Sequence, residues 1–146
     1  MNKLKNRVLP ELVISIYPKY NNLIKKQIKN FEFRPFEIYS PDDNQIIFWV
    51  YETTPTKSIK YKMLVNNPIT ALSPSQQYGL GEEQFYSNIT NGRFAYEIIS
   101  FQELESPIDF LSLKAINFFP PQNFTYLENN LQLKKILSKT SLNKIF

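Results

Sequence analysis

The chain has 146 residues, and 17 Lys and Arg against 13 Asp and Glu give it a net charge of +4. It contains no cysteine and no histidine, which excludes disulfides, thiol chemistry, histidine-based triads and the usual structural zinc sites. The longest apolar run, Ile46 to Tyr51, is far shorter than the about 20 residues of a membrane helix, and no signal-peptide pattern follows the basic start. We therefore expect one cytoplasmic domain outside the membrane, without metal or cofactor.

The first third of the chain predicts a strand, a helix and a second strand. Leu12 to Tyr17 lies between two prolines, and Pro18 suits the first turn of a helix. Apolar residues at helical spacing follow, with lysines mostly on the other side, which indicates a basic amphipathic helix. From residue 30 to 34 the period changes to two. Phe31 and Phe33 then point to the core, while Glu32 and Arg34 share the opposite face.

The middle third predicts two strands, a helix and a third strand. Residues 45–51 are apolar on both faces, as in a central strand covered on both sides, and a loop over 53–57 leads to a strand over 58–65. The segment 68–78 gives only a weak signal. Residues 81–86 resemble the start of a helix, and an Asn-Gly turn leads into a strand over 93–101.

The last third predicts mainly helix. Pro107 is expected to open a short helix or turn over 108–113, and a proline pair imposes an extended entry into 122–127. Residues 129–146 have a helical apolar pattern with four lysines outside, which predicts an added C-terminal helix packed across the flank of the sheet. The whole order indicates an α+β fold, a closed β-barrel-like sheet with flanking helices.

Charge is distributed unevenly along the chain. Residues 1–34 hold eight Lys and Arg against two carboxylates, a balance of +6, and residues 129–146 add four lysines without an acid. Residues 64–128 between them have a balance of −5. A basic face and an acidic face would suit a binder of a polyanion, whereas ordinary solvated surfaces explain the pattern equally well.

Five segments, taken in order, resemble the ASCH domain, a PUA-like β-barrel with helices beside it. They are Ser15 to Tyr20, Gln27 to Arg34, Tyr51 to Pro55, Tyr78 to Leu80 with Phe85-Tyr86, and Pro120 to Leu127. The resemblance covers residues 11–128, leaving 1–10 as a basic extension and 129–146 as the lysine-rich helix. The hallmark of the family is Gly-x-Lys-x-x-Glu-x-Arg. Lys29, Glu32 and Arg34 hold its three polar positions, and Gln27 replaces its glycine.

The resemblance implies an RNA- or nucleotide-binding module, because PUA-like domains commonly bind RNA or modified bases. Lys29 would meet a phosphate, Glu32 would accept from an exocyclic amine, and Arg34 offers a fork for a phosphate or a base edge. The further candidate contacts are Lys19, Tyr17, Tyr51, Thr54 and Tyr126. In the purely structural alternative, Glu32 and Arg34 form an ion pair at one end of the barrel, Lys29 is solvated, the tyrosines belong to the core or rim, and Thr54 belongs to a turn.

Two other functions stay open. One branch of ASCH proteins hydrolyses the acetyl amide of N4-acetylcytidine with the motif lysine, a threonine three residues later and a downstream glutamate. Lys29 matches that lysine and Glu32 stands in place of the threonine, so both are candidate catalytic residues, and Glu52 and Glu97 are candidates for the glutamate. The third possibility is a protein-interaction role, such as a phage or mobile-element inhibitor. The sequence decides neither whether the chain is an enzyme nor its oligomeric state.

Overall fold

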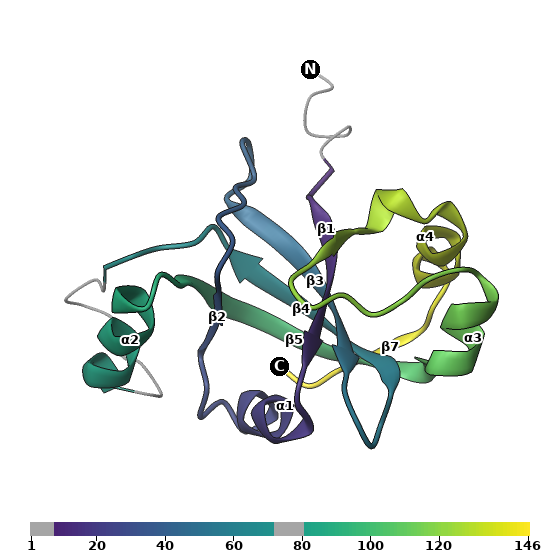
Figure 1. The fold of residues 1–146 in the computed structure, drawn as a ribbon, viewed down its shortest axis with the longest axis horizontal. Helices are drawn as coiled ribbons and strands as arrows, with labels where there is room; N and C mark the ends of the chain where they lie inside the picture. Colours follow the sequence, from purple (N-terminus) through teal and green to yellow (C-terminus); the bar gives the residue numbers. More distant parts are fainter. Residues whose placement is uncertain (1–7, 72–80) are drawn as a thin grey trace.

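The structure is a computed structural model that describes residues 8–71 and 81–146. Strands and helices alternate along the chain and give an α+β fold (Figure 1). In chain order the elements are β1 (Glu11–Ile16), α1 (Pro18–Lys25), β2 (Phe31–Arg34), β3 (Gln45–Glu52), β4 (Ser58–Asn66), α2 (Gly81–Thr90), β5 (Phe94–Asp109), α3 (Phe110–Ala115), β6 (Thr125–Tyr126), a 3-10 turn (Leu127–Asn129), α4 (Leu131–Ser138) and β7 (Leu142–Lys144).

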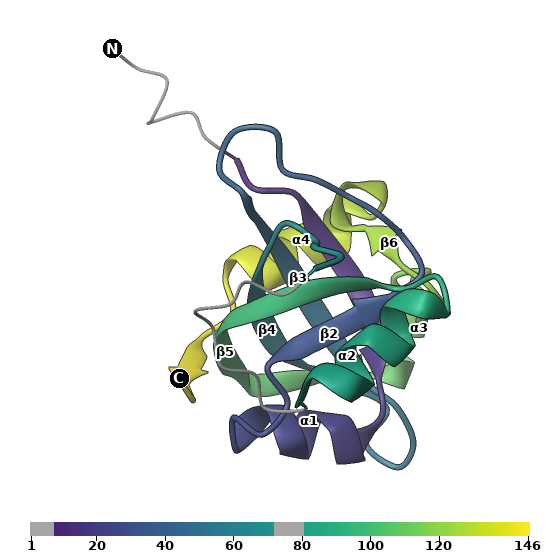
Figure 2. The same ribbon diagram turned by 90° about the vertical axis from the view of Figure 1, so that its left-hand side faces the viewer.

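The sheet has the strand order β2-β5-β4-β3-β1-β6, with β7 added beside β5. β1 and β3 are parallel and the other pairs are antiparallel. The long strand β5 pairs its residues 94–97 with β2 and continues along β4, so the sheet curls into a half-barrel (Figure 2). The barrel-like sheet with flanking helices expected from the sequence is confirmed, but the expected closure is wrong: the sheet is a half-barrel whose path ends at β2 and β6, which do not pair with each other.

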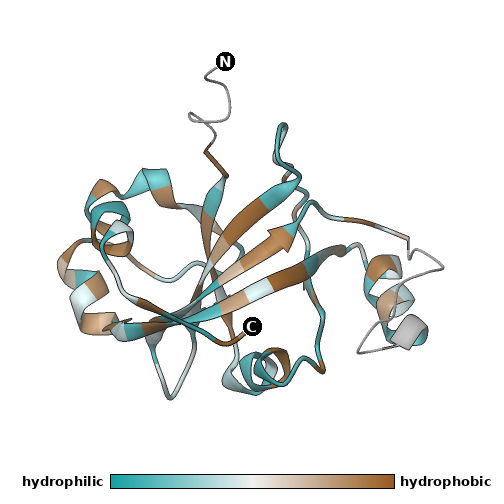
Figure 3. Ribbon diagram, turned by 180° about the vertical axis from the view of Figure 1, so that it is seen from behind, coloured by the Kyte–Doolittle hydropathy of each residue, from teal (hydrophilic) through white to brown (hydrophobic). Residues whose placement is uncertain are grey.

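Apolar side chains of the sheet form two core clusters, one on each face. Hydrophobic residues recur along the strands (Figure 3). Phe48 belongs to the core inside the curl, whereas its neighbour Trp49 belongs to a second core with α3 and α4. The central position predicted for β3 from its two apolar faces is therefore confirmed. A third cluster packs Phe85 of α2 against Phe31 and Phe33 of β2 and thereby fixes α2 beside that strand.

The helix or turn predicted over 108–113 is wrong in its first residues. β5 continues to Asp109, and α3 begins at Phe110, where the Asp109 carboxylate accepts a hydrogen bond of 2.8 Å from the Ser112 amide. Pro107 lies inside the strand because the pairing of β4 with β5 shifts register there. A bulge of this kind accommodates a residue that has no N–H to donate.

The helix predicted over 129–146 is also wrong in its second half. α4 begins after its cap Asn130, which accepts a hydrogen bond of 3.0 Å from the Leu133 amide, and it ends at Ser138. The chain then returns as β7 along residues 102–104 of β5. The prediction failed because helical periodicity does not reveal that the edge of β5 offers unpaired backbone groups to a following strand.

Candidate functional site

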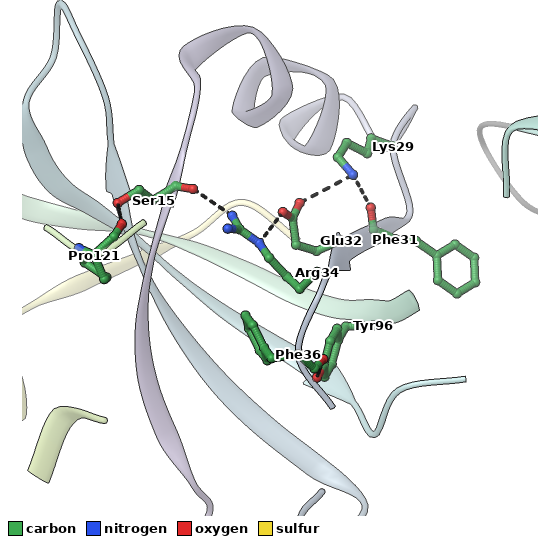
Figure 4. A network of polar contacts seen from close by, with 8 residues as sticks. All are labelled: Ser15, Lys29, Phe31, Glu32, Arg34, Phe36, Tyr96 and Pro121. Carbon is green, nitrogen blue, oxygen red and sulfur yellow. Dashed lines mark hydrogen bonds and ion pairs between the residues drawn. The ribbon is translucent and has the colours of Figure 1, made fainter. Parts of the chain in front are cut away.

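Three motif side chains form one network at the start of β2 (Figure 4). Glu32 Oε2 accepts a hydrogen bond of 2.9 Å from Arg34 Nε, and Glu32 Oε1 lies 3.4 Å from Lys29 Nζ. The side chains are only 8–11% exposed, so the ion pairs are shielded from water. Glu32 and Arg34 meet because alternate residues of a strand share a face. The structure thus brings the three predicted polar residues together.

Arg34 also spans the open side of the half-barrel. Its Nη2 donates a hydrogen bond of 2.7 Å to the Ser15 carbonyl on β1, a strand that is not paired with β2 in the sheet. Ser15 Oγ in turn donates to the Pro121 carbonyl at 2.8 Å. One part of the purely structural alternative is therefore present: the Glu32–Arg34 pair ties β2 to β1 where the sheet itself does not close.

Lys29 is not the solvated cation of that alternative. It is 7% exposed, donates to the Phe31 carbonyl and lies 5.2 Å from the centre of the Phe33 ring. Two residues before it, Gln27 adopts φ +57°. That left-handed conformation is the one glycine adopts most readily, so the backbone keeps the shape that the family glycine would supply.

A cleft of two adjoining pockets lies beside this network. The first, here called the β1 pocket, has a volume of about 560 Å³ and is lined by residues of β1, β2, the end of β3 and the segment 120–123. The second, the α2 pocket, has a volume of about 200 Å³ and lies between α1, β2 and α2. Four residues line both pockets: Tyr20, Glu32, Phe33 and Arg93.

The cleft combines exposed aromatic rings, a free cation and a buried acceptor. Tyr17 is 63% exposed and Tyr20 37%, and their ring centres lie 6.2 Å apart. Arg93 is exposed, and no carboxylate in the described parts of the chain lies within ion-pair distance of it. Glu32 Oε1 is buried and accepts no hydrogen bond from any residue of 8–71 or 81–146. These features could bind a stacked ring, a phosphate and a donor on a base edge.

Five of the eight predicted binding residues line the cleft. Lys29 faces the α2 pocket, Glu32 faces both pockets, and Arg34, Tyr17 and Tyr51 line the β1 pocket. Of these, Tyr51 is buried, and burial raises the pKa of its hydroxyl. The three motif residues and two of the predicted tyrosines therefore line the same cleft.

The other three predicted residues lie outside the lining. Lys19 lies over the Tyr20 ring at 5.0 Å, at the edge of the cleft. Thr54 is exposed in the turn after β3, and its neighbour Thr53 lines the β1 pocket instead. Tyr126 packs against Phe124 and faces a different hollow. Local structure explains why Thr54 and Tyr126 do not line the cleft. The turn after β3 exposes Thr54 to solvent, and β6 places Tyr126 at the other hollow.

The sequence analysis missed Tyr20, Arg93 and the pair Gln122-Asn123 as cleft residues. Tyr20 belongs to the apolar positions of the first helix, and that pattern suggested a core residue. Arg93 directly follows the Asn91-Gly92 turn, in which Gly92 adopts φ +79°. That turn was the only sequence signal near Arg93, and it indicates a change of chain direction but no binding role. Gln122 and Asn123 lie in a segment that carries the family resemblance, which was the available signal.

The two candidate downstream glutamates lie away from the cleft lining. Glu52 is buried, accepts hydrogen bonds from Asn21 (3.0 Å) and Thr56, and lies 3.8 Å from Lys60. Glu97 accepts from Asn66 at 3.2 Å. Neither carboxylate is among the residues that line the two pockets in the described chain.

The basic and acidic parts of the chain are in contact with each other. Lys25 of α1 lies 3.6 Å from Glu103 of β5, and Lys134 of α4 lies 3.6 Å from Glu128. Within residues 8–71 and 81–146, no three acidic residues gather closely enough to hold a metal ion. No helix in these ranges has the length and apolar character needed to cross a membrane.

Comparison with known proteins identifies solved structures of the same fold. No family sequence model and no curated protein matches the chain. The ASCH protein from Zymomonas mobilis is 29% identical, with a TM-score of 0.64 over 90% of this chain and 96% of that one. Its tyrosine-to-phenylalanine mutant (29%, TM-score 0.65) and its serine-to-alanine mutant (28%, TM-score 0.66) cover 90% and 91% of this chain and 99% and 100% of theirs. The chain therefore has the fold of these ASCH domain proteins and is similar to them in sequence over about 90% of its length.

Proposed function

We propose that the cleft binds single-stranded RNA or a nucleotide derived from it. The observation that carries the proposal is the exposed guanidinium of Arg93, which has no ion-pair partner among the described residues and lines a cleft together with the exposed residues Tyr17 and Tyr20. A backbone phosphate needs a cation, and an unpaired base needs an aromatic surface. The larger pocket, at about 560 Å³, falls within the roughly 300–1,000 Å³ typical of small-ligand sites.

The cationic side chains of the cleft have two roles: some hold the structure together, and one can bind a ligand. Lys29 and Arg34 are held by Glu32 and by backbone carbonyls, so they fix the shape of the cleft floor. Arg93 has no such partner in the described chain, and its guanidinium can therefore turn to a phosphate without breaking an ion pair. We assign phosphate binding to Arg93 and assign to the motif cations the task of holding Glu32 in place.

Glu32 supplies the base-edge contact in this proposal. Glu32 lines both pockets, and its buried Oε1 lies 3.4 Å from Lys29 Nζ and accepts no hydrogen bond from the described residues. An exocyclic amine or a ring N–H of a base would satisfy this oxygen. Gln122 and Asn123, which line the same pocket, add donors and acceptors of the kind that read base edges.

Binding is supported better than amide hydrolysis. A lysine nucleophile or base has to present a free amine to the substrate, whereas the Lys29 ammonium is directed at Glu32 and at the Phe31 carbonyl. The two glutamates considered as the downstream residue, Glu52 and Glu97, are engaged elsewhere. The contacts of Lys29 therefore favour a role in positioning Glu32.

Salt-dependent RNA binding tests the proposal. We expect a fluorescein-labelled single-stranded octanucleotide to bind at micromolar protein, with log K falling by about 0.7 per phosphate neutralised as log salt rises. Arg93→Gln should weaken binding and reduce the slope by about one phosphate. Lys135→Gln, an equal charge change on the exposed side of α4, is the matched control and should leave both unchanged.

Two results would overturn the proposal. One is no binding of the octanucleotide at low salt by folded wild-type protein. The other is equal losses of affinity from Arg93→Gln and Lys135→Gln, since this would locate any RNA contact in the general charge of the molecule instead of in the cleft.

A further inference from the structure

The cleft is divided into two pockets of unequal size that share one wall. The α2 pocket, at about 200 Å³, is too small for a whole nucleotide by the usual size of ligand sites, whereas the β1 pocket at about 560 Å³ is large enough. A single small ligand would fill only one of them. The shared residues Tyr20, Glu32, Phe33 and Arg93 define the boundary between them.

The residues at this boundary could bind the phosphodiester group that links two consecutive nucleotides. Tyr20 is 37% exposed and presents its ring to both pockets, so a base in either one can contact an aromatic surface. Arg93 also lines both and has no carboxylate partner in the described chain. The bridging phosphate of two consecutive nucleotides would lie between their bases, at the place where this free guanidinium is available.

The outer walls differ in a way that suits two bases. Gln84 and Asn88 of α2 line the α2 pocket. Asn88 Nδ2 donates a hydrogen bond of 3.0 Å to the backbone carbonyl of Gln84. Gln122, Asn123 and the Tyr17 ring line the β1 pocket. Each pocket therefore combines planar polar groups with a share of the Tyr20 ring.

We infer that the unit recognised by this cleft is a dinucleotide step of single-stranded RNA, with one base in each pocket and the bridging phosphate on Arg93. The inference rests on the proposed function and adds to it the size of the recognised unit. A mononucleotide uses one pocket only. A third nucleotide projects beyond the two pockets and adds little.

Competition against the labelled octanucleotide tests the inference. The competitors are a nucleoside, its 5′-monophosphate, the dinucleoside monophosphate and the trinucleotide of the same base. We expect the dinucleoside monophosphate to compete at least about tenfold better than the 5′-monophosphate, and the trinucleotide less than about threefold better again. Charge alone predicts the opposite order for the first pair, because a bridging phosphate carries less negative charge than a terminal one.

Two variants locate the effect. Asn88→Phe fills the α2 pocket from a half-buried helix position and should reduce the affinity for the dinucleoside monophosphate to that for the 5′-monophosphate. Arg93→Gln should weaken binding of the dinucleoside monophosphate about tenfold and change binding of the nucleoside by less than about twofold. Circular dichroism and the thermal midpoint of each variant confirm that it is folded.

The outcomes separate the inference from the proposed function. If the octanucleotide does not bind, the proposed function is wrong. If it binds but the 5′-monophosphate competes within about twofold of the dinucleoside monophosphate, the function stands and the dinucleotide unit is wrong. A steady gain with each added nucleotide, or no effect of Asn88→Phe, also contradicts the two-pocket unit.

Discussion

Glu32 is the residue on which the geometry of the cleft floor depends. Its carboxylate faces two cations, Arg34 at 2.9 Å and Lys29 at 3.4 Å, and all three side chains are almost fully buried. Buried ion pairs of this kind contribute little net stability when complete, but loss of one partner leaves an uncompensated charge inside the protein. The network therefore fixes geometry more than it raises the free energy of unfolding.

Removal of the Glu32 charge should be strongly destabilising. We expect Glu32→Gln to lower the free energy of unfolding by about 3–5 kcal/mol, because Lys29 and Arg34 stay buried without a counter-charge. Glu128→Gln is the matched control: its pair with Lys134 is largely exposed and should contribute less than about 1 kcal/mol. Urea unfolding followed by circular dichroism measures both, and equal effects would show that the network is not a buried one.

Gln27 takes a backbone conformation that is unfavourable for a residue with a side chain. At φ +57° a non-glycine residue costs roughly 1–2 kcal/mol relative to glycine. We expect Gln27→Gly to raise the free energy of unfolding by about 1 kcal/mol. Lys26→Gly, one residue earlier at φ −86°, should lower it. A loss of stability in both variants would mean that the Gln27 side chain contributes more than its backbone costs.

The motif residues and the free arginine differ in how well the sequence reveals them. Lys29, Glu32 and Arg34 were found through the resemblance to the ASCH motif, whose three polar positions they hold, and strand alternation then places Glu32 beside Arg34. Arg93 lies about sixty residues after Arg34 along the chain and has no motif of its own. Only the pairing of β2 with β5, which sets Arg34 opposite Phe94, brings it to the cleft.

At the scale of elements, the side chain of Tyr96 attaches β5 to the connection between β2 and β3. It is fully buried, donates a hydrogen bond of 2.7 Å to the Phe36 carbonyl and accepts one of 3.1 Å from the Ile38 amide. Burial raises the pKa of the Tyr96 hydroxyl to about 12. The hydroxyl thus holds a long connection against the half-barrel in its protonated form.

This shift predicts a loss of stability in alkali. Because the folded protein keeps the Tyr96 proton above pH 10 while the unfolded chain loses it, the contribution is complete below pH 10 and is lost as the pH rises toward 12. Its size is at most about 3 kcal/mol. The stability difference between wild type and Tyr96→Phe should therefore shrink between pH 10 and 12. The difference for Leu133→Ala, a change in the core cluster that does not include Tyr96, should stay constant, and parallel curves for both variants would contradict the assignment.

Elements were predictable where a local pattern determines them and not where a distant partner does. The two apolar faces of β3 and the proline at the first position of α1 are local signals, and both elements form as expected. The end of β5 and the strand β7 depend on each other across some forty residues of sequence, since Leu142 pairs with Leu104. No local pattern in either segment records that partnership.

At the scale of the whole molecule, the cleft lies on the open side of the half-barrel. The sheet ends at β2 on one side and at β6 on the other. Arg34 of β2 donates a hydrogen bond to the Ser15 carbonyl of β1 and so connects two strands that do not pair in the sheet. The fold class and its family resemblance could be predicted from segments in order. The open side could not, because whether a curled sheet closes depends on strand pairing that composition and periodicity do not determine.

The location of the RNA on the molecule is the most direct test of the account. On titration of the isotope-labelled protein with the single-stranded octanucleotide, we predict that the largest amide chemical-shift changes occur at the non-proline residues of 15–20, 29–34, 88–93 and 120–123. The amides of α4 should not change. Shift changes concentrated on α4 and β7, or none at all with saturating RNA, would contradict the assignment of the cleft as the nucleic-acid site.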